Sequence, residues 1–387
     1  MRKLFLSFIA VLLWTGIFAE SVDVSSARRV AESFLAGIEA KNIGQLNDIT
    51  STTPFREFYV FSIGDEGFIL VSADDCVLPI LGYSLTNKFS VKNMPKNVKA
   101  VLEGYDEQIR FYKEQANTAT LRTSDGGVSE NDIVAEQWKM LLSGTAPEPD
   151  YTTSVAPLLT TTWNQSPYYN NMCPYDENYY ENTVTGCVAT ATAQIMKYWN
   201  HPTTGYGSHS YNHSAYGTLS ANFGTTTYDW NNMPTALSAN STTAELNAVA
   251  TLMYHVGVAI EMNYGVSATG GSSANNYSYL GEVNASSQHA LVEYFKYSPD
   301  MQVLSKAEYS DADWDAVLMA ELDQNRPILY SGRDLSGGHS YVCDGYNQEG
   351  MFHINWGWGG YCDGYYEMGA LNPAPGGTGG NATYTFN

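Results

Sequence analysis

The chain changes composition sharply near residue 150, and this break constrains the fold more than any other feature of the sequence. Residues 1–150 hold 14 of the 19 lysines and arginines, whereas residues 151–387 hold 25 of the 29 tyrosines. The stretch 143–150 reads Ser-Gly-Thr-Ala-Pro-Glu-Pro-Asp, which is typical of an exposed linker that a protease can cut. Because 387 residues are too many for a single hydrophobic core, we expect two domains with different roles.

The first 19 residues are typical of a secretory signal peptide. Arg2 and Lys3 precede an uncharged apolar run from Leu4 to Phe18, which is short for a helix that crosses a bilayer. We therefore exclude residues 1–19 from the fold. The chain is expected to be exported, to the extracellular space, the periplasm or the cell surface, and to have no stable membrane span.

Residues 20–150 predict a small α+β domain and the linker. One helix is expected after Ser25 as its N-cap, and a second is expected to open at Pro95. Three β-like runs are expected between these helices, at 58–61, 67–71 and 78–83. The third run contains Pro79, so we expect it to be an edge strand. No catalytic constellation is visible in this unit.

Residues 151–387 mix helices and strands. A helix is expected to begin near Cys187, and helical spacing predicts further helices at 243–256, 287–296 and 311–323. Strands are expected at 327–331, 339–346 and 351–356. Residues 201–232 form a long region rich in Tyr, Asn, Ser and Gly, and residues 374–380 are expected to form a loop.

Composition also excludes several kinds of chemistry. The net charge of −21 makes nucleic acid an unlikely partner, since an acidic surface repels phosphates. No CxxC pair or HExxH motif suggests a zinc site, and no GxGxxG or P-loop suggests a nucleotide, so we expect no cofactor. The five cysteines are an odd number for an exported chain, which predicts at least one free thiol.

Cys187 is the candidate nucleophile. It follows Thr185 and Gly186 at the start of an alanine-rich, apolar helix pattern that ends near Trp199. Free backbone N–H groups and the helix dipole at that end favour an anion, and they are expected to lower the thiol pKa from about 8.5 toward about 3.5–7.5. A buried structural cysteine is the alternative reading of a lone thiol.

His339 and Asn355 are the candidate base and its orienting amide. His339 follows Gly337 and Gly338 and opens a predicted strand, and Asn355 ends the next one. A hairpin turning at 346–350 would place Asn355 opposite His339 or within a few residues of it. Trp356 is then expected to lie over the His–Asn pair and exclude water, although an ordinary core tryptophan is the alternative.

Gln165, in Trp163-Asn164-Gln165, is the candidate side-chain donor for an oxyanion. The backbone N–H of Cys187 would supply the other donor. Spacing alone supports the role of Gln165 weakly, and a surface glutamine is the alternative.

These stretches resemble the streptopain and interpain type of papain-fold cysteine proteases. The resemblance is carried by Trp163-Asn164-Gln165, the run 186–198, Trp314 with 324–327, Gly337-Gly338-His339 and the run 355–360. Residues 58–84 resemble the prosegment of that family. The Cys187 and tryptophan-glycine runs are long and specific.

The resemblance implies a fold, the roles of the site residues and an enzyme that its prodomain keeps inactive. It implies an α+β papain-like catalytic unit at 151–387, with a helical and an antiparallel β part, behind an inhibitory prodomain and linker at 20–150. Cys187 would be the nucleophile, His339 the acid–base, Asn355 its orienter and Gln165 an oxyanion donor; the Cys–His–Asn order fits. Gly338, Thr269 and Gly270 would line the substrate cleft. Family members continue beyond residue 387, so this chain is expected to be truncated at its C-terminus.

We therefore expect a secreted cysteine endopeptidase made as a latent zymogen. Its partners would be protein or peptide substrates and its own prodomain, which acts as an intramolecular inhibitor. A papain-fold acyltransferase or amidase remains an alternative, and an inactive secreted binding protein is a weaker one. Cys173, Cys343 and Cys362 are expected either to be small core residues or to supply one disulfide and one thiol.

Overall fold

The structure describes most of the chain from residue 20 onward. The computed structural model covers residues 20–38, 40, 44–91, 94, 96–117, 130–276, 285–334, 337–369 and 385–386. The expected signal peptide and the expected loop at 374–380 lie outside these ranges. In the described ranges, no helix is long and apolar enough to cross a membrane.

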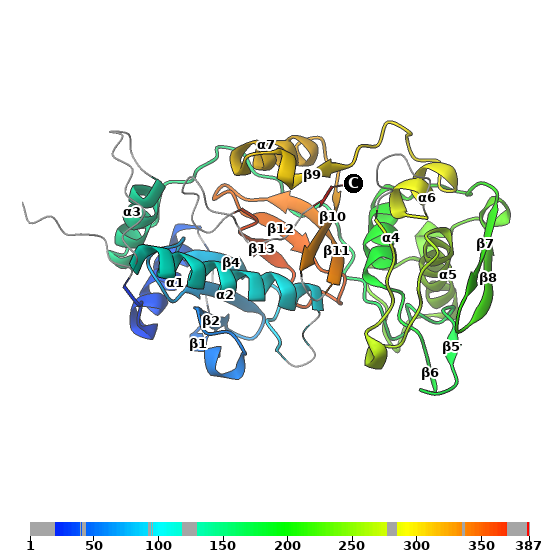
Figure 1. Ribbon diagram of the computed structural model, residues 1–387, viewed down its shortest axis with the longest axis horizontal. Helices are drawn as coiled ribbons and strands as arrows, with labels where there is room; N and C mark the ends of the chain where they lie inside the picture. The colour runs from blue at the N-terminus through cyan, green and yellow to red at the C-terminus, as the bar shows by residue number, and fades with distance from the viewer. Residues whose placement is uncertain are drawn as a thin grey trace, which may run out of the picture.

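Strands from both parts of the chain join in one sheet (Figure 1). The first part supplies β1 (Leu46–Asp48), β2 (Phe58–Ile63), β3 (Gly67–Ser72) and β4 (Ile80–Ser84). The second part supplies β9 (Leu304–Ser305), β10 (Ile328–Asp334), β11 (Gly337–Tyr346), β12 (Phe352–Asn355), β13 (Gly364–Tyr366) and β14 (Thr385–Phe386). Within the described residues the sheet has ten strands in the order β1-β2-β3-β4-β13-β12-β11-β10-β14-β9. The predicted strands are confirmed, with ends shifted by a few residues.

The expectation that the third strand lies at an edge is wrong. β4 pairs with β3 on one side and with β13 on the other, through Tyr83↔Tyr365 and Gly82↔Tyr366. Pro79 lies just before the strand and contributes only its carbonyl, which accepts from the N–H of Ser72. The missing proline N–H therefore costs the ladder nothing. This junction makes the sheet continuous across the composition break.

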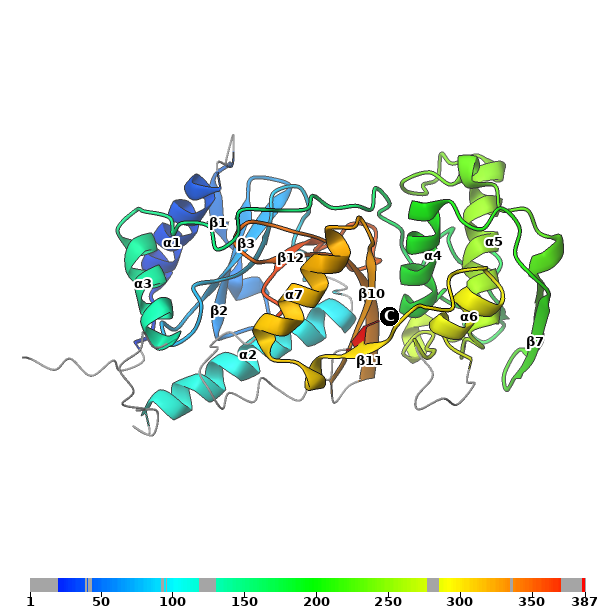
Figure 2. The same cartoon turned by 90° about the horizontal axis from the view of Figure 1, so that it is seen from above.

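Helices cover both faces of the sheet, as Figures 1 and 2 show. On one face, α2 (Lys96–Asn117) and α7 (Asp311–Leu322) pack over a core that draws on both parts of the chain. On the other face, α1 (Val24–Gly37) and α3 (Glu130–Leu142) cover the N-terminal strands. α4 (Cys187–Trp199) covers β10 and β11 on that second face. The first helix is capped by Asp23 rather than Ser25, because the Asp23 carboxylate accepts from the N–H groups of Ser25 and Ser26.

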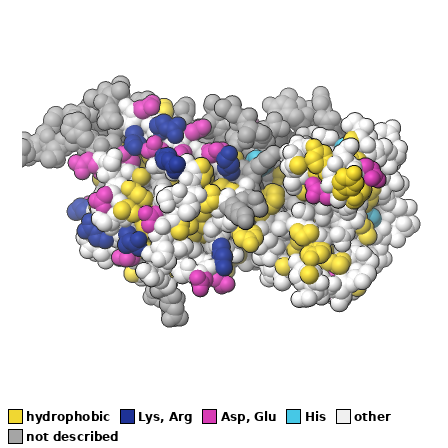
Figure 3. Space-filling model, turned by 90° about the horizontal axis from the view of Figure 1, so that it is seen from below, with side chains coloured by type: hydrophobic (Ala, Val, Ile, Leu, Met, Phe, Trp, Pro, Cys, Tyr) yellow, Lys and Arg dark blue, Asp and Glu magenta, His cyan; other side chains and the backbone are white. Residues whose placement is uncertain are grey.

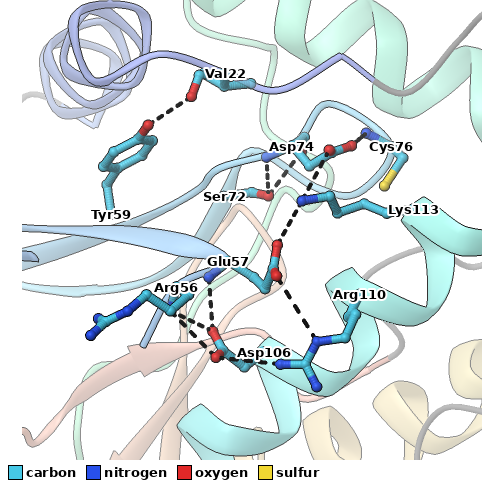
Figure 4. Close-up of polar contacts among 10 residues, drawn as sticks. All are labelled: Val22, Arg56, Glu57, Tyr59, Ser72, Asp74, Cys76, Asp106, Arg110 and Lys113. Carbon is cyan, nitrogen blue, oxygen red and sulfur yellow. Dashed lines mark hydrogen bonds and ion pairs between the residues drawn. The ribbon is translucent and has the colours of Figure 1, made fainter. Parts of the chain in front are cut away.

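A polar network fixes α2 on the sheet (Figure 4). The Asp106 carboxylate accepts the backbone N–H groups of Arg56 and Glu57 at the start of β2. Two turns further along α2, the Lys113 ammonium lies 2.7 Å from Glu57 and 3.7 Å from the buried carboxylate of Asp74. The ammonium lies between two carboxylates, so it neutralises charge that the sheet would otherwise bury unpaired. The network therefore sets where α2 crosses the sheet.

The remaining helices form a separate lobe beside the sheet. α5 (Thr243–Ala259) and α6 (Ser287–Glu293) pack with α4 around a second core, and the predicted helices at 243–256, 287–296 and 311–323 are confirmed. Two hairpins were missed: β5 (Tyr175–Asp176) with β6 (Glu181–Asn182), and β7 (Ser208–His213) with β8 (Gly217–Asn222). Figure 3 shows that basic side chains gather over the N-terminal side of one face and not over this lobe.

Candidate active site

The chain turns into α4 at a position that only glycine fits. Gly186 has φ 88°, and a Cβ there would lie 2.7 Å from the terminal methyl of Met262. The turn places Cys187 at the first residue of α4, half-buried, with the rest of the helix packed behind it. Buried alanines and threonines along α4 let it pack closely between the helical lobe and the sheet. The expected placement of Cys187 is confirmed.

The expected lowering of the Cys187 pKa is wrong for this form of the chain. Desolvation by burial raises the pKa of the thiol above its ordinary value. Hydrogen bonds from Ser340 and from the backbone at Cys187 and Val188 act in the opposite direction but are outweighed. The helix end thus favours the thiolate as expected, yet the surroundings keep the group protonated. Ser340 in turn accepts a hydrogen bond from the Asn276 side chain at 2.6 Å.

His339 lies next to Ser340 but on the other face of β11. Side chains alternate along a strand, so Ser340 and Val342 share one face and His339 and Tyr341 share the other. Val342 packs with α4 residues, whereas Tyr341 packs in the core that α2 covers. β11 therefore brings the His339 backbone close to Cys187 and turns its imidazole toward the α2 side of the sheet.

Asn355 occupies the position that the hairpin predicts. β11 and β12 pair antiparallel with Asn355 opposite Val342, three residues along from His339. The Asn355 side chain is buried, and its oxygen accepts from Gln194 Nε2 at 2.9 Å and from the N–H of Gly357 at 3.1 Å. Its nitrogen donates to the carbonyl of Thr161 at 2.8 Å. In this arrangement Asn355 is fixed to α4 and to residue 161.

The other candidates surround the start of α4. Gln165 is buried, and its carbonyl accepts the N–H of Thr185 at 3.3 Å, two residues before Cys187. The loop of Thr269 and Gly270 leads to Ser272, whose hydroxyl donates to the Val184 carbonyl at 2.6 Å. Gly338 pairs with Arg333 on β10, two residues before Ser340. Three segments distant in sequence thus meet around residues 184–187.

Trp356 lies in the core beside β11. Its indole is buried, with its centroid 4.7 Å from that of Tyr341 and its Nε1 donating to the Cys362 carbonyl at 3.0 Å. Because Tyr341 and His339 share a face of β11, Trp356 lies on the side to which the imidazole is turned. Its backbone N–H donates to the Asp363 carboxylate at 2.8 Å.

The chain is similar to known proteins. Residues 163–366 match the model of the Peptidase C10 family, and residues 19–109 match that of the Spi protease inhibitor. Streptopain of Streptococcus pyogenes is 34% identical over 339 residues, which span 84% of this chain and 77% of the relative.

This chain belongs to the Peptidase C10 family.

Solved structures of Prevotella intermedia proteins agree with this C10 assignment. A prointerpain A fragment with a cysteine replaced by alanine is 33% identical, with a TM-score of 0.68 over 89% of this chain and 98% of that one. Active interpain A cysteine protease is 39% identical, with a TM-score of 0.52 over 62% of this chain and 96% of that one. This C10 chain is therefore a cysteine peptidase with a papain-like fold, and its Spi-like prodomain makes it a zymogen.

Three of the other cysteines of this peptidase are core residues. All five cysteines are free thiols, so the alternative of a disulfide is not supported. Cys173, Cys343 and Cys362 are buried, and burial raises the pKa of Cys173 and of Cys362 to about 12. Such thiols are protonated and unreactive at neutral pH.

Two further residues of the C10 site were missed from the sequence. Ser340 contacts the sulfur from the strand that bears His339. Gln194 is fully buried on α4 and bonds Asn355. A signal for Gln194 was present, because Cys187, Thr190 and Gln194 fall at i, i+3 and i+7, and such residues share one face of a helix.

Proposed function

We propose that this zymogen is an exported cysteine endopeptidase that hydrolyses peptide bonds through Cys187, His339 and Asn355. The observation that carries the proposal is the contact between the Cys187 sulfur and Ser340, since it brings the nucleophile helix against the strand that bears His339. Export rests on the N-terminal run of residues 1–19.

In the active form the reaction is acyl transfer. The Cys187 thiolate attacks the carbonyl carbon of the scissile bond, and the His339 imidazolium gives its proton to the leaving amine. Water, deprotonated by the neutral imidazole, then hydrolyses the thioester. The Cys187 N–H and the Gln165 amide stabilise the oxyanion. Asn355 orients the imidazole, and Trp356 keeps water from that pair. Gly338, Thr269 and Gly270 line the cleft in which the peptide lies.

The prodomain keeps the catalytic side chains of Cys187 and His339 apart in the zymogen. Two features support latency: a Cys187 thiol whose pKa is raised by burial, and an imidazole turned to the face that α2 covers. Removal of residues 20 to about 150 would take α2 away from that face. Gly337 and Gly338 then allow the backbone at the start of β11 to change conformation, which brings the His339 imidazole to the α4 side of the sheet.

Casein and a fluorescent primary amine together test the class of reaction. The processed enzyme is expected to fragment casein, and prior alkylation with iodoacetamide should stop the fragmentation. Incorporation of the amine without fragmentation would favour an acyltransferase. The absence of both activities, together with a Cys187 that iodoacetamide alkylates no faster than the other cysteines, would favour a binding protein.

A further inference from the structure

Gln194 joins three parts of the candidate site through one side chain. Its Oε1 accepts from the Thr161 hydroxyl at 2.9 Å and from the Trp163 N–H at 3.1 Å. Its Nε2 donates to the Asn355 oxygen at 2.9 Å, and Asn355 returns a bond to the Thr161 carbonyl. The ring of contacts is closed, and all of these side chains are buried.

The position of Gln194 on α4 couples this ring to the nucleophile. Gln194 lies seven residues after Cys187, which is about two helical turns, so both side chains project from one face of a rigid helix. Trp163 lies two residues before Gln165, the candidate oxyanion donor. The ring therefore ties the candidate orienter and the candidate oxyanion segment to the helix of the nucleophile.

We propose that Gln194 is a positioning residue, which sets the orientation of the Asn355 carboxamide and thereby the imidazole that Asn355 holds in the active enzyme. This inference rests on the proposed function. The amide of Asn355 has an oxygen that accepts and a nitrogen that donates, and a donor at Gln194 specifies that the oxygen points to α4. Misorientation of a catalytic group by about 1 Å can cost about 10²-fold in rate.

Gln194→Glu is the sharpest test, because it keeps the shape of the side chain and its acceptor oxygen but replaces the donor to Asn355 by a carboxylate oxygen. A carboxylate still accepts from Thr161 and Trp163, but it offers no donor to the Asn355 oxygen and favours a flipped amide. We expect the kcat of the processed enzyme on a peptide substrate to fall by about 10- to 100-fold, with KM within about twofold of the wild type. Thr192→Val is the matched control: it removes a buried hydrogen bond on the same helix, to Ser287, and should leave kcat unchanged.

A double-mutant cycle separates positioning from general damage. If Gln194 acts through Asn355, Gln194→Glu should change kcat by less than about threefold in an Asn355→Ala background. Effects that multiply in the double variant would overturn the inference, as would a Gln194→Glu enzyme with wild-type kcat. Should Gln194→Glu fail to fold, Thr161→Val loosens Gln194 without adding charge and enters the same cycle. An Asn355→Ala enzyme with full activity would instead contradict the proposed function itself.

Discussion

Cys187→Ala is expected to abolish both proteolysis and self-maturation. Without the sulfur no acyl-enzyme can form, and losses on removing a catalytic nucleophile reach about 10⁶-fold. Followed by mass spectrometry, the wild-type chain from residue 20 onward should shorten by about 125–135 residues as the linker is cut, whereas the variant should keep its full mass.

Cys173→Ala is the matched control for this experiment. It removes a buried thiol from the helical lobe and leaves the start of α4 intact, so maturation should proceed. A Cys187→Ala chain that shortens itself in the absence of any other protease would refute the assignment of the nucleophile.

His339→Gln is expected to inactivate the processed enzyme while leaving the full-length chain almost unchanged. Loss of the acid–base group costs about 10²- to 10⁴-fold in rate. In the zymogen, however, the imidazole is turned away from α4, so the rate at which iodoacetamide alkylates Cys187 should match that of the wild type. Processing of the variant is to be carried out by added wild-type enzyme.

His201→Gln serves as the control, since His201 lies beyond the end of α4, where its imidazole lies 3.2 Å from the Lys296 carbonyl and packs against the Tyr297 ring. It should retain activity. A processed His339→Gln enzyme within tenfold of the wild type would remove His339 from the mechanism.

Local signals in the sequence were sufficient for the parts of the site that short segments build. Gly186 followed by an alanine-rich run located Cys187 at a helix start, and the two patterned runs around residues 346–350 gave the hairpin of Asn355. These features depend on neighbours in the chain, so periodicity and turn chemistry specify them.

The parts that long-range packing builds could not be predicted in this way. The pairing of β4 with β13 joins strands from the two units, and nothing within either strand encodes its partner. The face on which His339 lies follows from which helices cover the sheet, and the raised pKa of Cys187 follows from the burial that this covering produces. β7 and β8 were missed because Ser208–His213 is polar on both faces, so the hydrophobic alternation that marks a strand is absent.

The pH dependence of Cys187 alkylation, measured before and after removal of the prodomain, tests the central claim most directly. A group with a raised pKa stays protonated to higher pH, so Cys187 in the full-length chain should react with iodoacetamide only at a pH above that at which an ordinary free thiol reacts. After processing, the imidazolium and the helix end should stabilise the thiolate, and alkylation should be rapid at about pH 6. If both forms gave the same profile, with no reaction at about pH 6, the account of a latent thiol that the prodomain holds inactive would be contradicted.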